Sequence, residues 1–114
     1  MDELFAEIAT TIGLDPAVAR KAVGVIADFV RHEAPADTVA ALFDKLPGAR
    51  ALADENAQGS GGLFGLLNDL TGAGLGMGEI QSVAIAFVAF AKAKAGAKDV
   101  DAVIAAIPAL GQFM

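Results

Sequence analysis

His32 is the single histidine of the sequence, and imidazole is the side chain best suited to proton transfer near neutral pH. No partner for acid–base catalysis is visible beside it. A metal site would need further ligands at suitable spacing, and the nearby carboxylates of Asp28 and Glu33 form no recognisable set. The simpler interpretation is that His32 lies near the end of a helix, where the helix dipole favours a cation.

Two pairs of carboxylates, Asp54 with Glu55 and Asp99 with Asp101, could in principle bind a divalent cation. The Asp-x-Asp pair lacks the glycine and the distal glutamate of a calcium loop. We therefore predict that these side chains cap the starts of helices, and we expect neither a metal nor a cofactor.

The glycine-rich segment from Gly72 to Gly78 invites comparison with loops that bind phosphate. A dinucleotide fingerprint fails, because its last glycine would fall on Met77 or Glu79, and the Gly-Lys-Ser/Thr of a Walker loop is absent. We interpret the segment as a flexible linker that runs into a helix N-terminus, with anion binding there as the alternative. The serines and threonines lack the context of a nucleophile elbow, so we expect no enzymatic activity.

Composition excludes several other classes. The 114 residues suit one domain, and 14 acidic against 8 basic side chains give a net charge of -6, which opposes nucleic-acid binding. Cysteine is absent, so disulfides and thiolate sites are excluded. The start of the chain is acidic where a secretory signal is basic, and no apolar run reaches the roughly 18 residues of a transmembrane helix. We expect a cytoplasmic protein.

The elements that would position these residues are all predicted to be helices, which makes the fold all-α and multihelical. Apolar residues at helical spacing predict a first helix over residues 2–12 that stops at Gly13. Asp15 as N-cap and Pro16 at the first position predict a second helix that runs to about Glu33.

The second helix is predicted to expose Arg20, Gly24, Asp28 and Arg31 on a narrow polar face. Pro35 interrupts the helical pattern, which resumes over residues 37–46 and completes a helical hairpin over 14–47. One short further turn is expected over 49–53.

Residues 53–78 are predicted to be a glycine-rich linker, since eight of the thirteen glycines lie between Gly59 and Gly78. A short helix near 63–70 inside it is strongly apolar, which is unusual for a solvated linker. We define its large side chains as the linker patch, a candidate interaction surface that consists of Leu63, Phe64, Leu66, Leu67 and Leu70. Leu63, Leu66, Leu67 and Leu70 share one stripe that a core could cover, whereas Phe64 lies to its side.

The second half of the chain repeats the first. A shift of 61 aligns residues 13–52 with 74–113 without a gap, and eight of the forty aligned residues are identical. The repeat predicts a second hairpin over 75–108, related to the first by approximate two-fold symmetry. Its helix from Glu79 to about Ala95 contains nine consecutive apolar residues from Val83 to Ala91, so we expect it to be the most buried helix.

Five segments carry a resemblance to a known family. They are an acidic Met-Asp-Glu-Leu start, a Leu-Pro-Gly-Ala turn at 46–49, a glycine-rich centre, Gly-Leu-Gly-Met-Gly-Glu-Ile at 74–80 and a Pro-x-Leu-x-Gln-Phe end at 108–113. On these segments, which span nearly the whole chain, the protein resembles an uncharacterised bacterial family of unknown function. The resemblance implies an all-helical fold and no particular activity.

Two classes of function remain. The first is a non-catalytic protein-interaction or structural module, and the glycine-flanked linker patch supports it. The alternative is a protein that binds a membrane surface or an apolar ligand through the same patch, although an acidic chain would be repelled by anionic lipid. The patch also predicts a homodimer, since a two-fold dimer commonly hides such a surface.

Overall fold

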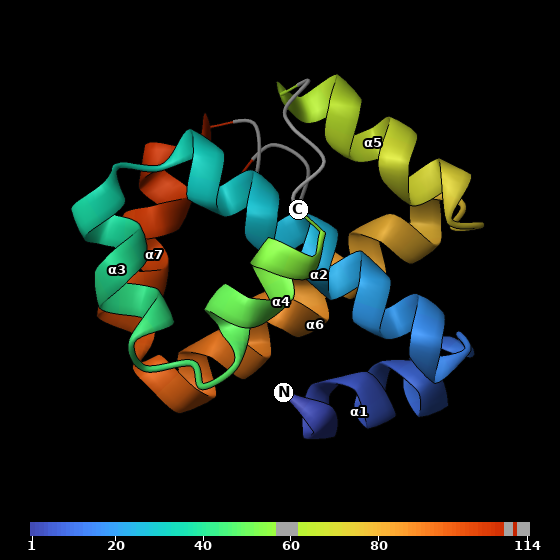
Figure 1. Ribbon diagram of the computed structural model, residues 1–114. Coiled ribbons are helices and arrows are strands. Elements are labelled where there is room, and N and C mark those ends of the chain that lie inside the picture. Colours follow the sequence, from blue (N-terminus) through green and yellow to red (C-terminus); the bar gives the residue numbers. More distant parts are fainter. Residues whose placement is uncertain (57–61, 109–110, 112–114) are drawn as a thin grey trace.

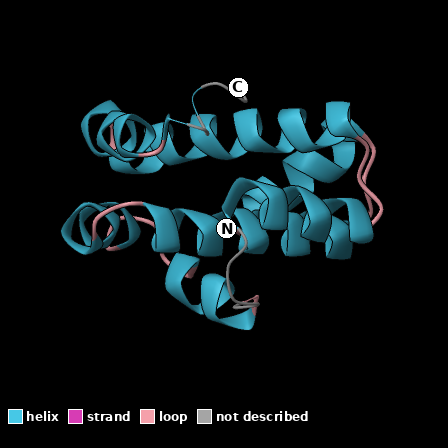
Figure 2. Cartoon of the chain, turned by 90° about the horizontal axis from the view of Figure 1, so that it is seen from above, coloured by secondary structure: helices cyan, strands magenta, loops and turns pink. Residues whose placement is uncertain are grey.

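The computed structural model describes residues 1–56, 62–108 and 111 (Figure 1). Within these residues the chain forms seven helices and no strands, so the predicted all-α class is confirmed. The helices are α1 (Asp2–Ile12), α2 (Pro16–Glu33), α3 (Ala36–Phe43), α4 (Ala49–Glu55), α5 (Gly62–Gly72), α6 (Met77–Ala95) and α7 (Ala97–Ala106). Seen from above, most of them lie in two stacked layers, and one short helix lies beneath the lower layer (Figure 2).

The first two helix boundaries follow from local sequence. Gly13 adopts φ 85°, the left-handed conformation that glycine tolerates best, and its N–H donates to the carbonyl oxygen of Ala9. The Asp15 carboxylate then accepts a hydrogen bond of 2.8 Å from the backbone N–H of Ala17, and Pro16 occupies the first position of α2. The predicted stop of α1 and start of α2 are both confirmed.

The predicted repeat agrees with the helix boundaries. α2 and α6 begin 61 residues apart, at Pro16 and Met77, and α3 and α7 begin 61 residues apart as well. α2 and α6 contact each other in the centre of the molecule, and α3 and α7 lie side by side on the left of Figure 1. The two-fold relation between the halves remains a prediction.

The prediction that the helix over 79–95 is the most buried is wrong. α2 is the central helix: its buried residues include Gly24 and Asp28 together with the apolar positions between Ala19 and Val30. It packs against α1, α3, α4, α5 and α6. In α6, by contrast, Ile85 is 49% exposed and Ala89 is exposed, so the run of apolar residues does not by itself indicate burial on all sides.

The predicted linker over 53–78 is largely helical in its described part. α4 extends to Glu55, and α5 covers 62–72 where only a short helix near 63–70 was expected. Between α5 and α6 the chain turns through Gly74 at φ 102°, and the Leu75 N–H donates to the carbonyl oxygen of Leu70. Residues 57–61 of the predicted linker lie outside the described residues.

Candidate functional site

Asp28 is the buried charged residue of α2, with a relative exposure of 4%. Its carboxylate accepts a hydrogen bond of 2.6 Å from Arg31, which also pairs with Asp54 of α4. The hydrogen bond to Asp54 is the largest cause that raises the pKa of the Arg31 guanidinium, and burial opposes it. Arg31 therefore joins α2 to α4 as a permanent cation, which is a structural role.

His32 lies near the end of α2, as the sequence predicted. Its Nδ1 is 2.9 Å from the carbonyl oxygen of Asp28 and 3.4 Å from that residue's carboxylate. These distances suit an imidazole that donates to a carbonyl in the last turns of the helix. Among the described residues, no group of three or more His, Asp and Glu side chains could hold a metal ion.

The prediction that the remaining carboxylates cap helix starts is right only for the position of Asp99, which lies in the first turn of α7, although no side chain caps that helix through a hydrogen bond. Glu55 ends α4 and accepts two hydrogen bonds of 2.8 Å from Arg20 of α2. Asp99 accepts a hydrogen bond of 2.5 Å from Lys45, which follows α3. These carboxylates pair with cations from distant parts of the chain, so they make tertiary contacts and bind no metal ion in the described structure.

The N-terminus of α6 already holds a carboxylate of this chain. Oε1 of Glu79 accepts a hydrogen bond of 2.9 Å from the Gly76 N–H, in the way that a glutamate in the first turn caps a helix. The Glu79 carboxylate therefore lies at the helix N-terminus where a bound anion was the alternative prediction.

The residues of the linker patch differ in their exposure: some are buried in the core and others lie at the surface. Leu66 and Leu70 are buried in the core, and α5 packs on α2. Leu67 is half-buried, whereas Phe64 is 83% exposed. The Leu63 side chain lies outside what the structure describes. The described residues of the leucine stripe, Leu66, Leu67 and Leu70, thus pack on the protein's own core, whereas Phe64 lies at the surface.

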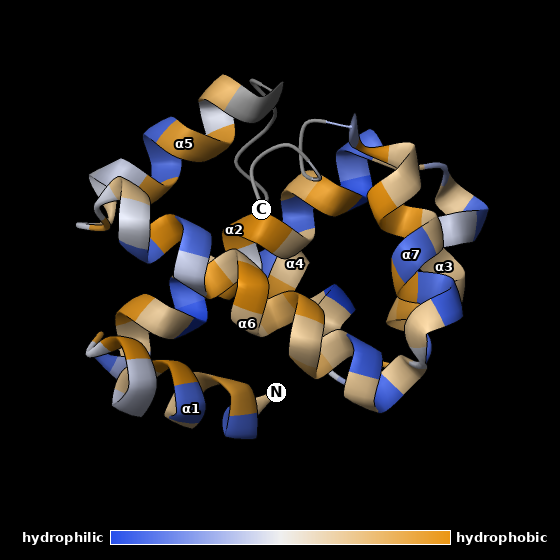
Figure 3. Ribbon diagram, turned by 180° about the vertical axis from the view of Figure 1, so that it is seen from behind, coloured by the Kyte–Doolittle hydropathy of each residue, from blue (hydrophilic) through white to orange (hydrophobic). Residues whose placement is uncertain are grey.

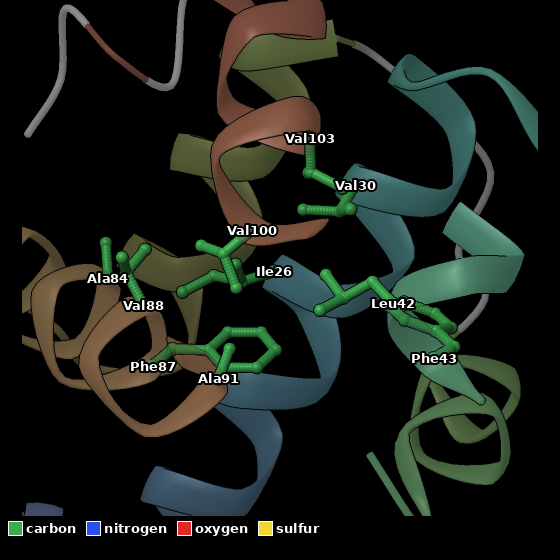
Figure 4. Close-up of a pocket in the computed structure, with 10 residues that line it drawn as sticks. All are labelled: Ile26, Val30, Leu42, Phe43, Ala84, Phe87, Val88, Ala91, Val100 and Val103. Atoms are coloured by element: carbon green, nitrogen blue, oxygen red, sulfur yellow. The ribbon is translucent and has the colours of Figure 1, made fainter. Parts of the chain in front are cut away.

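A small apolar cavity lies between the two halves (Figure 4), with a volume of about 30 Å³. An engineered cavity that binds benzene has about 150 Å³, so this one is too small for a ring-sized ligand. Its walls are wholly apolar and come from α2, α3, α6 and α7: Ile26, Val30, Leu42, Phe43, Ala84, Phe87, Val88, Ala91, Val100 and Val103.

A much larger open groove runs between α1 and α6, which lie next to each other in the view from behind (Figure 3). The two helices are antiparallel, since Glu3 near the start of α1 lies 3.9 Å from Lys94 near the end of α6. The groove has a volume of about 730 Å³. We call it the α1/α6 groove, and its lining consists of Glu7, Ile8, Thr11, Ile12, Gly78, Glu79, Ser82, Ile85, Ala86 and Ala89.

The α1/α6 groove combines an apolar floor with acidic and hydroxyl groups. Ile85 is its most exposed large apolar residue at 49%, and Ile12 is half-buried against the core. Glu7 from α1 and Glu79 from α6 are the charged residues of the lining. This groove was not predicted from the sequence, because Ile85 lies inside the run of consecutive apolar residues. The polar residues Glu79 and Ser82 on the same side of α6 could have indicated it.

In the described residues, no single helix is both long enough and apolar enough to cross a membrane. Phe64–Gly72 of α5 and Met77–Ala95 of α6 have the required length and hydropathy only when they are taken together, and a bend of 107° separates them. Comparisons with family models, with curated proteins and with solved structures returned no match.

Proposed function

We propose that this protein is a non-catalytic protein-interaction module that binds a helical segment of its partner in the α1/α6 groove. The observation that carries the proposal is Ile85, a large aliphatic side chain left 49% exposed in an open groove of about 730 Å³. Single exposed apolar residues are ordinary on convex surfaces, but one that lies in a groove with other apolar groups marks a binding surface.

The energetics of the groove suit a moderate interaction. Complete burial of an isoleucine side chain contributes about 1.5 to 3 kcal/mol, so covering the exposed half of Ile85 contributes roughly 1 kcal/mol. Ile12, Ala86 and Ala89 extend the apolar surface on both sides of it. Because the small side chains of Ala86 and Ala89 leave room above α6, another helix can approach closely.

The alternative function, binding of a membrane surface or an apolar ligand, has less support. The small apolar cavity has too little volume for a ring-sized ligand, and the larger groove carries Glu7 and Glu79, which anionic lipid would repel. The homodimer predicted from the linker patch would depend on Phe64 and Leu67, since Leu66 and Leu70 are buried.

Selection from a phage library of random helical peptides tests the proposal directly. Peptides selected on the wild-type protein should bind at least about tenfold more weakly to Ile85→Asp. Ala41→Asp provides the matched control, because Ala41 is also an exposed helical residue but lies on α3. Circular dichroism checks that both variants fold. If the selected peptides bind wild type and Ile85→Asp equally well, the α1/α6 groove is not the docking surface.

A further inference from the structure

The face of α6 that lines the α1/α6 groove has a counterpart on α2, and a short helix of the same chain, α4, packs on that counterpart. In the shared register of α2 and α6, Gly24 corresponds to Ile85 and Asp28 to Ala89. On α2 this face is covered by α4, whose Leu52 and Asn56 lie against Gly24. On α6 the equivalent residues are exposed and Ile85 lines the α1/α6 groove.

The binding of α4 to α2 shows what such a surface requires. The centre of α4 is apolar, with Ala49, Leu52 and Ala53 buried. Charged pairs lie at the C-terminal end of α4: Arg20 of α2 bonds to Glu55 at 2.8 Å, and Arg31 of α2 pairs with Asp54. The long helix supplies the cations and the short helix supplies the anions.

The charges in the α1/α6 groove are reversed. Glu7 and Glu79 are the charged residues of its lining, and the part of the lining that the structure describes contains no lysine or arginine. Lys92, which takes the place of Arg31 in the shared register, lies outside the lining and is 3.6 Å from Asp101. We infer that the occupant is a short amphipathic helix of a partner protein whose apolar face is flanked by lysine or arginine, an inference that rests on the proposed function.

The charge of the chain argues against a second copy in this groove. The protein carries a net charge of -6, and α1 exposes three acidic residues, Asp2, Glu3 and Glu7. A second copy would therefore bring further negative charge to a groove that is already acidic. A basic helix meets complementary charge, which favours association and orients the helix in the groove.

Two synthetic helical peptides of about 14 residues, long enough for roughly four turns, test the inference. They share one pattern of Leu and Ala and differ only in flanking residues, which are Lys in one and Glu in the other. Fluorescence anisotropy should show the Lys peptide binding at least about tenfold more tightly than the Glu peptide, with an affinity that falls as salt is added.

A charge-neutralised variant provides the second measurement. Glu7→Gln with Glu79→Gln should weaken binding of the Lys peptide about tenfold, while glutamine keeps the capping group at the start of α6. Glu33→Gln with Asp69→Asn is the matched control, since it removes the same charge from exposed positions outside the groove and should leave the affinity unchanged.

The outcomes separate this inference from the proposed function. Binding of the Glu peptide as tightly as the Lys peptide, lost in Ile85→Asp, would overturn the basic partner and leave the groove as a docking surface. Absence of any binding that depends on Ile85 would overturn both. Self-association of the protein that disappears in Ile85→Asp would identify a second copy as the occupant and also overturn the inference.

Discussion

Gly24 of α2 lies directly beneath Asn56 at the end of α4. A Cβ atom placed on Gly24 would be 2.1 Å from Nδ2 of Asn56 and 3.1 Å from the carbonyl oxygen of Leu52. Asn56 is itself held in place, because its Nδ2 donates a hydrogen bond of 2.9 Å to the same carbonyl. Glycine is therefore needed at this position for α4 to approach α2 closely.

The first prediction is that Gly24→Ala destabilises the protein although alanine is the better helix former. Overpacking typically costs about 1 to 3 kcal/mol, and the gain in helix propensity is about 1 kcal/mol, so we expect a net loss of up to about 2 kcal/mol. Urea denaturation of Gly78→Ala gives the control: its Cβ meets nothing within 4 Å, so it should be neutral or stabilising. Equal stability of the two variants would show that α4 can move away from α2 at no cost.

The position of α4 also explains why the predicted exposed face of α2 is wrong, since Gly24 and Asp28 are buried. The polar side of α2 has the composition of a solvent-exposed face and consists of Arg20, Gly24, Asp28 and Arg31. A short helix that covers this side was not considered. Only one turn was expected over 49–53, and so short an element has little periodicity to reveal which face it covers. The caps at Gly13 and Asp15, in contrast, depend on neighbouring residues alone and were predicted correctly.

The second prediction concerns the buried carboxylate of Asp28. Asp28→Ala should destabilise the protein by about 1 to 3 kcal/mol, because it removes a hydrogen bond to a charged partner and leaves Arg31 with Asp54 alone. The control Glu55→Gln weakens an ion pair whose two side chains are each about half exposed, so it should cost less than about 1 kcal/mol. Thermal and urea unfolding measure both, and a smaller loss for Asp28→Ala would contradict this account.

The third prediction ranks three phenylalanines. Phe87 is 6% exposed and lines the apolar cavity, so Phe87→Ala should cost about 3 to 5 kcal/mol. Phe90 is half-buried and lies under Lys94 at 5.6 Å from its ring centre, so its truncation should be less costly than that of Phe87. Phe64→Ala should change stability by less than about 0.5 kcal/mol. Equal losses of melting temperature in Phe87→Ala and Phe64→Ala would place Phe64 in the core.

The fourth prediction is that the cavity between the halves can be filled. Val100→Ile adds one methylene group beside a space of about 30 Å³, so it should stabilise the protein by up to about 0.8 kcal/mol. Val83→Ile makes the same chemical change at a fully buried residue outside the lining and should be neutral or destabilising. Chemical denaturation distinguishes the two, and a loss of stability in Val100→Ile would mean that the cavity cannot accept the group.

The linker patch and the α1/α6 groove differ in how well their exposure could be predicted from the spacing of apolar residues. The stripe of leucines was predicted to be available to the core, and Leu66 and Leu70 are buried while Phe64 beside them is exposed. The groove was not predicted, because the run of apolar residues around Ile85 carries no helical periodicity, and only Glu79 and Ser82 just before the run indicate an exposed side of the helix. Which side of that run stays exposed depends on where α1, α2 and α7 pack on α6.

The last prediction tests self-association through the part of the linker patch that remains at the surface. Phe64 is 83% exposed and Leu67 is half-buried, so complete burial of Phe64 in a partner would contribute about 1.5 to 3 kcal/mol before ordering costs. In a two-fold dimer both copies contribute, about 3 to 6 kcal/mol together, which supports at most a weak dimer with a dissociation constant of tens of micromolar or weaker. Analytical ultracentrifugation over a hundredfold range of concentration should show the mass rise towards two chains in the wild-type protein and remain at one in Phe64→Ser. The same rise in both proteins would place the dimer interface elsewhere, and a constant mass of one chain in both would show that Phe64 does not mediate self-association.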